Sequence, residues 1–479
     1  MTEQRHRAAT AIFALAALAG AALISLRATY EPDLWWHLAQ GREIAAGRLV
    51  RTNLFSFTYP DYPQHYTSWL FDLGSYWLWT SLGATSLQVA QALAIALTLF
   101  VVAATCRLRS SLAATAAVCI FGWLIIEPRA LPRPHVLSFL GLAGCAYLIE
   151  RARVHRSWRP LRWTPLLVAL WANVHVECVF GVAVVGLFGA GEFLHPRSLP
   201  RRDAALVVAT AAVSLLFTIL TPYGLGLFEY LYENASVPQI VNIAELLPPY
   251  LPNYRAFFVW AILVAFALVV GWRSARLSDA LILVFAGYLA FRHLRMTPLF
   301  FLASAPLVAR AIDDLRRVRI DPRAVAMTTA AAALVLARIP VPAMLGELRV
   351  GRGALMVPEF FSAPAMQFAR DHHLSGPVFT SMNLGGFVAW ELYPSARVFV
   401  DSRLQAYPPE HFRTVIEASK DQQAWQAITA GVDWAVVSLP RADQLSGVGQ
   451  FRSPGWRVAF EDQSTRIIVR QKPGAYPPP

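Results

Sequence analysis

The chain has 479 residues, of which 56% are hydrophobic and only 15% are charged. Ordinary soluble domains are about 25% charged, and a single hydrophobic core stops growing near ~250–300 residues. The surplus of apolar residues must therefore face lipid, which excludes a simple cytosolic enzyme.

The net charge is +12, and only Lys420 and Lys472 among the 42 basic residues are lysines. A basic excess occurs in nucleic-acid-binding proteins, but in a membrane protein it is typical of cytoplasmic loops. The arginines here gather between apolar runs, so we expect a lipid bilayer and no nucleic acid as partner.

Apolar runs follow one another from the N-terminus to residue 339, and about eleven of them are candidate membrane spans. Several approach the ~20 residues that a bilayer requires, and others are shorter. They are Ala8–Leu26, Ser86–Thr105, Leu112–Ile126, Val136–Ile149, Thr164–Asn173, Val179–Leu194, Ala204–Leu220, Phe257–Trp272, Ala280–Phe291, Thr297–Ala309 and Val325–Ile339. The fifth and sixth could also form one broken helix.

Arginines lie at the N-terminus and in every second loop. With eleven spans, all of these arginines fall on one face, which the positive-inside rule makes cytoplasmic. They are Arg5 and Arg7, Arg107 and Arg109, Arg151 to Arg162, Arg197 to Arg202, Arg273 and Arg276, and Arg316 to Arg323. The first loop, 28–85, and the C-terminal segment then face outward.

The segment after the last span is hydrophilic and mixes short strand-like runs with helical stretches. The strand-like runs are Val378–Thr380, Val398–Asp401, Trp434–Ser438, Arg457–Phe460 and Arg466–Val469. The helical stretches are Pro364–His373, Phe412–Ser419 and Gln422–Ala430. We therefore expect an α-helical polytopic membrane domain over 1–343 and an α/β soluble domain over 344–479.

Two carboxylates, Glu31 and Asp33, stand just after the first span, next to Trp35, Trp36 and His37. Such a pair can deprotonate a substrate hydroxyl or bind a divalent cation such as Mg²⁺ or Mn²⁺. The tryptophans can stack on a sugar ring. The alternative is structural: Asp33 as a helix N-cap and the tryptophans as an interfacial belt.

Four outward-facing arginines form a second candidate site. They are Arg129, Arg133, Arg292 and Arg295, with His135 beside them. Guanidinium groups bind phosphate bidentately, so a phosphate ligand would justify arginines near lipid. Snorkelling helix ends, or ion pairs with Glu127 and Glu245, are the alternative.

A third polar group, Trp171-Ala-Asn-Val-His175-Val-Glu177, follows the fifth span. Polar residues at membrane depth are costly unless they are paired or used. A hydrogen-bonded helix break and a functional site both account for it.

The chain resembles the GT-C superfamily of polytopic membrane glycosyltransferases, and more closely a largely uncharacterised bacterial group of that type. The segments that carry the resemblance are Glu31–Gly41, Arg51–Thr58, Ser68–Asp72, Trp171–His175, Thr221–Gly224, Arg295–Phe300, Asn383–Phe387 and Val398–Arg403. They run along most of the chain.

The resemblance implies a bacterial inner-membrane enzyme that moves a sugar from a polyprenyl-phosphate donor, with its C-terminal domain in the periplasm. Asp33 and Glu31 match the family's acidic motif, which acts as base or metal ligand. Basic residues hold the donor phosphate, and Glu245 matches an acidic position of the Thr221 loop. The acceptor would be a glycan, a lipid or a protein, and transfer would invert the anomeric centre.

Two further functions remain as alternatives. A transporter or lipid flippase would place ionisable residues in mid-span and repeat its broken helices, and few such residues are found here. A non-catalytic envelope scaffold would use the soluble domain to bind a partner.

Overall fold

The computed structural model describes residues 19–21, 31–65, 67–236, 244–251, 254–272, 276–317, 360–439, 451 and 455–471. Except for residues 19–21, the candidate spans Ala8–Leu26 and Val325–Ile339 lie outside these ranges, as does the predicted boundary at 343. The chain divides into two compact units. Unit 1 comprises 1–27, 88–224 and 243–348, and unit 2 comprises 28–87, 225–242 and 349–479.

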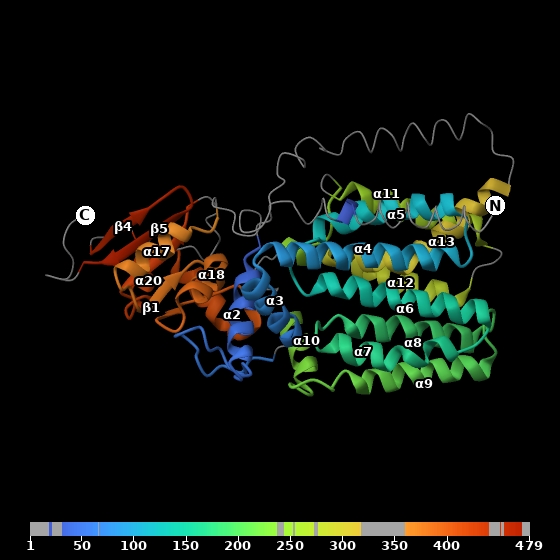
Figure 1. Cartoon of the computed structure of the whole chain (residues 1–479), viewed down its shortest axis with the longest axis horizontal. Helices are drawn as coiled ribbons and strands as arrows, with labels where there is room; N and C mark the ends of the chain where they lie inside the picture. The colour runs from blue at the N-terminus through green and yellow to red at the C-terminus, as the bar shows by residue number, and fades with distance from the viewer. Residues whose placement is uncertain are drawn as a thin grey trace, which may run out of the picture. The chain divides into compact units, whose positions relative to one another are not determined.

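Unit 1 is helical, and every predicted span within the described ranges is a helix (Figure 1). Its α-helices are α4 (Thr85–Arg107, whose first turn belongs to unit 2), α5 (Leu112–Ile126), α6 (His135–His155), α7 (Thr164–Ala172), α8 (Cys178–Leu194), α9 (Arg201–Phe217), α11 (Arg255–Val270), α12 (Leu277–Arg292) and α13 (Thr297–Arg317). Short 3-10 turns are η1 (Glu127–Arg129), η2 (Arg159–Trp163), η4 (Ala244–Leu246) and η6 (Leu294–Met296).

Three helical stretches within the described residues are long and apolar enough to cross a membrane: Thr85–Arg107, Leu112–Arg129 and Leu294–Leu315. The last of these includes α13, which packs against α5, α6, α11 and α12. Helices α5 and α13 approach closely at Gly122 of α5. The ring of Phe301 of α13 occupies the space that a Cβ at this position would need. Small residues of this kind let membrane helices pack closely.

Helices α7 and α8 are two separate helices rather than one broken helix. The backbone N–H of Trp158, ahead of α7, donates to Asp203 at the start of α9, and Asn173 after α7 donates to the carbonyl of Leu220 after α9. Helix α7 therefore runs parallel to α9. Helix α8 runs antiparallel to α9, since Gly189 faces Val207 and Gly186 faces Ala211.

Unit 2 contains a mixed five-stranded sheet with the strand order β2-β1-β3-β5-β4. Strands β2, β1 and β3 are parallel, and β3, β5 and β4 are antiparallel. The strands are β1 (Gly376–Thr380), β2 (Ala396–Val398), β3 (Trp434–Ser438), β4 (Trp456–Glu461) and β5 (Thr465–Arg470). The helices are α2 (Asp33–Ala45), α3 (Trp69–Leu82), α10 (Gly226–Ser236), α17 (Ala363–Asp371), α18 (Met382–Leu392), α19 (Pro409–Ala418) and α20 (Gln422–Ile428), with the 3-10 turn η7 (Leu404–Ala406).

The residues after the first predicted span belong to the core of this α/β unit. Trp35 of α2 is fully buried and makes edge contacts with Trp79, Phe361 and Phe387. The following loop adds to the sheet edge, since Phe55 O and Phe57 N–H bond to β2. Segments far apart in the sequence thus share one hydrophobic core.

Candidate functional site

The first group of candidate residues lies at the N-terminus of α2 in unit 2. The carboxylate of Glu31 is fully buried, and its Oε1 accepts a hydrogen bond from the backbone N–H of Asp33 at 2.9 Å. Glu31 therefore satisfies one of the N–H groups that a helix start leaves without an intrahelical partner. Asp33 is the first residue of α2 rather than its N-cap, and it is half-buried.

Ser402 completes the surroundings of Asp33. Its hydroxyl donates to Asp33 Oδ1 at 2.5 Å. The backbone on both sides of Ser402 is fixed by Asp401 and Arg403, which are fully buried and form an ion pair at 2.6 Å. The Arg403 guanidinium also donates to Asn53 and Gln64 of the first loop.

Helix α18 packs directly onto this loop and onto α2. A Cβ on Gly385 would lie 2.2 Å from the carbonyl oxygen of Val400, and a Cβ on Gly386 would lie 3.2 Å from that of Pro32. Only a residue without a side chain fits at Gly385. The segments Asn383–Phe387 and Val398–Arg403, which carry part of the family resemblance, therefore meet the acidic pair.

Three predicted site residues, Trp35, Trp36 and His37, are buried against structural partners in unit 2. His37 is buried, and its Nδ1 donates to Asp72 Oδ1 of α3 at 2.6 Å. Trp36 stacks on the His37 ring with the ring centroids 3.7 Å apart, and it is also buried. Trp35 packs in the core, as described above. Within unit 2, Asp33 is the most accessible residue of the predicted site.

The second group lies in unit 1 and gathers around the carboxylate of Glu245 in η4. Arg129 Nη1 donates to Glu245 Oε2 at 2.6 Å, and Arg133 Nη1 donates to Oε1 at 3.2 Å. The turn η6 holds Arg295 nearby, because the N–H of Leu294 donates to the carbonyl of Leu247. We call Arg129, Arg133 and Arg295 the proximal arginine cluster.

The three arginines of this cluster outnumber the one carboxylate between them. Burial raises the pKa of Glu245, but the charges of Arg129, Arg133 and Arg295 outweigh it and hold the pKa well below its ordinary value. Glu245 is thus ionised and pairs with two of the predicted phosphate ligands, as the ion-pair alternative expected. The Nε groups of Arg129 and Arg295 are nevertheless buried without a hydrogen-bond partner among the described residues.

The histidines of the predicted site extend this group. His135 Nε2 donates to the carbonyl of Arg129 at 2.7 Å, and its ring centroid lies 6.5 Å from that of His175. His175 Nδ1 lies 2.8 Å from Ser138 Oγ and 3.5 Å from Glu177 Oε2. Five predicted residues, Arg129, Arg133, His135, His175 and Glu245, are therefore brought together, with Arg295 beside them.

Trp171 positions the His175 turn. Its indole N–H donates to Ser138 Oγ at 2.9 Å, and its ring lies against Gly141 of α6 and Gly181 of α8. By contrast, Arg292 is exposed at the end of α12 and makes no hydrogen bond or ion pair with the described residues. Arg292 is thus the member of the predicted set that this cluster leaves out.

Sequence reasoning missed several partners. Asp401, Ser402 and Arg403 belong to the segment Val398–Arg403 that carries the family resemblance, but the sequence pattern does not assign them to the site, and it does not point to Ser138 either. A signal was present, because Asp-Ser-Arg follows the strand β2 after two intervening residues, where loops of α/β folds present polar groups. For Ser138, a lone serine within an apolar run gives no such signal.

The predicted metal site was tested on the donor groups. Across the described ranges, no group of three His, Cys, Asp or Glu side chains could hold a metal ion. Glu31 Oε1 is used by the helix start and Asp33 Oδ1 by Ser402. Within the described residues, Glu31 and Asp33 thus do not belong to a ready-made metal site of three protein ligands.

Comparison with solved structures shows the fold. The chain is similar to the archaeal oligosaccharyltransferase AglB from Archaeoglobus fulgidus, solved with an inhibitory peptide and a dolichol-phosphate, with a TM-score of 0.59 and 12% identity over 89% of this chain and 69% of that one. The same enzyme solved with Zn and sulfate gives a TM-score of 0.56 and 13% identity over 88% and 68%. No protein-family model and no curated protein matches by sequence. The shared fold agrees with the fold expected from the GT-C resemblance.

Proposed function

We propose that the protein is an inverting glycosyltransferase that uses a polyprenyl-phosphate sugar donor. The observation that carries the proposal is the proximal arginine cluster, which offers buried guanidinium N–H groups in a fold shared with an enzyme solved with dolichol-phosphate. Guanidinium groups are the side chains best suited to phosphate.

The donor phosphate would bind at the proximal arginine cluster. Arg295 makes no hydrogen bond or ion pair within the described part of the chain, so its guanidinium can turn to a phosphate oxygen without losing a partner. Arg129 and Arg133 are held by Glu245, which fixes their orientation. Charge on the phosphate grows as the sugar leaves, so preorganised guanidinium groups stabilise the transition state more than the ground state.

Asp33 would act as the general base. Its carboxylate takes the proton of an acceptor hydroxyl, and that oxygen forms a bond to the anomeric carbon from the side opposite the phosphate. The bond between the anomeric carbon and the phosphate oxygen breaks, and the electron pair leaves with the polyprenyl phosphate. Glu31, which is fully buried against the backbone of Asp33, serves as a positioning residue.

The reaction would take place on the outer face of a bacterial inner membrane, with unit 2 in the periplasm and an acceptor that is a glycan, a lipid or a protein. The arginine distribution and the GT-C resemblance support this location.

Two assays test the two halves of the proposal separately. Binding of undecaprenyl phosphate, measured by native mass spectrometry, is expected to weaken about tenfold in Arg295→Gln, because one charge-assisted hydrogen bond is lost. Arg292→Gln is the matched control and should bind as the wild type does. Equal binding by Arg295→Gln and the wild type would remove the donor assignment.

Transfer is measured with tritiated sugars on undecaprenyl phosphate, supplied to membranes that contain the protein. Asp33→Asn is expected to lower transfer at least about a hundredfold while undecaprenyl phosphate still binds. Wild-type transfer by this variant would exclude Asp33 as the base. Absence of transfer from every labelled donor by the wild type would overturn the proposed reaction class.

A further inference from the structure

A second group of charged side chains, buried or half-buried, lies at the other end of the unit 1 helices. It contains the guanidinium groups of Arg109, Arg153, Arg276 and Arg310, which we call the distal arginine cluster. Helix α6 connects the two clusters, with His135 at one end and Arg153 near the other. Eighteen residues of α-helix span roughly 27 Å, close to the ~30 Å thickness of a bilayer hydrocarbon core.

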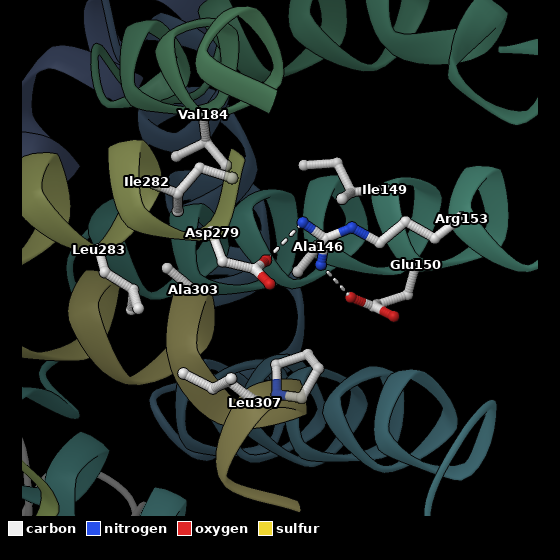
Figure 2. Close-up of a pocket in the computed structure, with 11 residues that line it drawn as sticks. Ala146, Ile149, Glu150, Arg153, Val184, Asp279, Ile282, Leu283, Ala303 and Leu307 are labelled. Atoms are coloured by element: carbon white, nitrogen blue, oxygen red, sulfur yellow. Dashed lines mark hydrogen bonds and ion pairs between the residues drawn. The ribbon is translucent and has the colours of Figure 1, made fainter. Parts of the chain in front are cut away.

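Two carboxylates link the members of this cluster. Arg153 donates to Glu150 at 2.6 Å and to Asp279 at 2.5 Å, and Figure 2 shows it lying between the two acids. Arg310 lies 3.3 Å from Glu150 and 3.8 Å from Asp279. The four arginines thus share the carboxylates of Glu150 and Asp279. A third acid, Asp314, lines the same cavity as Arg276 and Arg310.

Of the four arginines, Arg276 has the weakest contact with a carboxylate. Its closest carboxylate oxygen, on Asp279, is 3.8 Å away, and it makes no hydrogen bond with the described residues. Burial and then the charges of Arg153 and Arg310 lower the pKa of Arg276 to about 10. The attraction of Asp279 contributes less to this pKa than either repulsion.

Arg276 and Arg310 also face empty space. They line a cavity of about 120 Å³ between α11, α12 and α13. Asp279 and Asp314 line it as well, and the rest of its wall is apolar or small, with Ala267, Leu268, Leu307 and Ala311 among its residues. Asp279 and Leu307 separate it from the smaller cavity of Figure 2. A cavity of this size with charged side chains in its wall holds several water molecules or one compact anion.

The surroundings of the cavity fit a membrane surface. Trp272, two residues after the end of α11, is 66% exposed, and Leu268 and Val269 in the last turn of α11 are exposed as well. Exposed tryptophan beside apolar side chains is typical of the level of lipid head groups. An anion entering here would have its charge at the arginines and its apolar part along α11.

We propose that the distal arginine cluster is a binding site for a phosphate group, with Arg276 and Arg310 as its ligands. The same chemistry is offered by the head group of an anionic phospholipid and by free phosphate. The apolar wall and the lipid-facing residues around it favour the phospholipid. The site is separate from the proposed donor site and does not depend on it.

The test uses the purified full-length protein and two probes, phosphatidylglycerol and inorganic phosphate. Native mass spectrometry should show retention of phosphatidylglycerol by the wild type and about tenfold weaker retention by Arg276→Gln. Arg151→Gln is the matched control, because Arg151 lies at the same end of α6 but bonds to Tyr147 and lines neither cavity.

A stability measurement separates a ligand site from a structural role. Arg276 is repelled by its neighbours, so Arg276→Gln should leave the melting temperature of the lipid-free protein unchanged or higher, while the stabilisation on adding phosphatidylglycerol is lost. Stabilisation by inorganic phosphate alone, lost in the same variant, would identify free phosphate as the ligand. Equal retention and stabilisation of the wild type and Arg276→Gln by both probes would overturn the proposal.

Discussion

The hydroxyl of Ser402 donates to the carboxylate of Asp33 at 2.5 Å, although 369 positions separate the two residues in the chain. This bond joins the start of α2 to the loop after β2 within unit 2. It also fixes one oxygen of Asp33, which orients the carboxylate that we propose as the base.

We expect Ser402→Ala to lower kcat of sugar transfer about tenfold and to leave KM nearly unchanged, because a charge-assisted hydrogen bond to the base is lost. Ser402→Thr keeps the hydroxyl and should restore most of the rate. If Ser402→Ala and Ser402→Thr are equally slow, the hydroxyl does not position Asp33.

We expect Arg403→Met to destabilise unit 2 by about 3–5 kcal/mol, since it leaves the fully buried carboxylate of Asp401 without its ion-pair partner. Hydrogen–deuterium exchange in β1 and β3 of the full-length protein measures this loss. Arg397→Met in β2 is the control, because Arg397 is exposed. Similar hydrogen–deuterium exchange in Arg403→Met and Arg397→Met would show that the ion pair of Asp401 and Arg403 does not stabilise unit 2.

We expect Gly385→Ala to disrupt both folding of unit 2 and transfer. The added Cβ would lie 2.2 Å from the carbonyl oxygen of Val400, so α18 and the Ser402 loop must move apart. Gly431→Ala meets no atom within 4 Å and should behave as the wild type does. If Gly385→Ala shows the hydrogen–deuterium exchange and the transfer activity of the wild type, the contact between Gly385 and Val400 is not tight.

The stability of unit 2 should depend on pH through His411. Burial lowers the pKa of this histidine to about 4, whereas an exposed histidine titrates near ~6.5. The unfolded chain therefore binds a proton first as the pH falls. The contribution of neutral His411 to the free energy of unfolding of unit 2 is therefore complete above about pH 6.5. It is lost as the pH falls from about 6.5 to 4.

At pH 5 this loss amounts to about 2 kcal/mol relative to pH 7. Hydrogen–deuterium exchange of the sheet at the two pH values should show it in the wild type. His411→Asn, which cannot take up the proton, should show a smaller change. Equal pH dependence in the two proteins would exclude His411 as the cause.

The local elements could largely be predicted from the sequence. Helix α5 (Leu112–Ile126) and strand β3 (Trp434–Ser438) have the predicted bounds, because apolar runs with clear ends specify them. Helix α18 was missed, since two adjacent glycines disfavour a helix by local propensity. Tertiary packing decides there, because those glycines let α18 contact Val400 and Pro32.

The candidate site was predictable only where its residues are close in sequence. The pair Glu31 and Asp33 is visible in the chain, but the contact with Ser402 depends on how distant segments fold into one core. Likewise, four arginines were grouped by their predicted loops. Only the fold brings Arg129 and Arg133 to the carboxylate of Glu245 and leaves Arg292 exposed.

The packing of Trp35 against Phe361 and Phe387 has a consequence for biosynthesis. A ribosome makes Asp33 early and these two phenylalanines only after all the helices of unit 1. Until then the apolar side of α2 has no native partner, so the nascent chain is open to chaperones and proteases. A chain terminated before residue 360 would therefore contain Asp33 but lack the core that holds α2 in place.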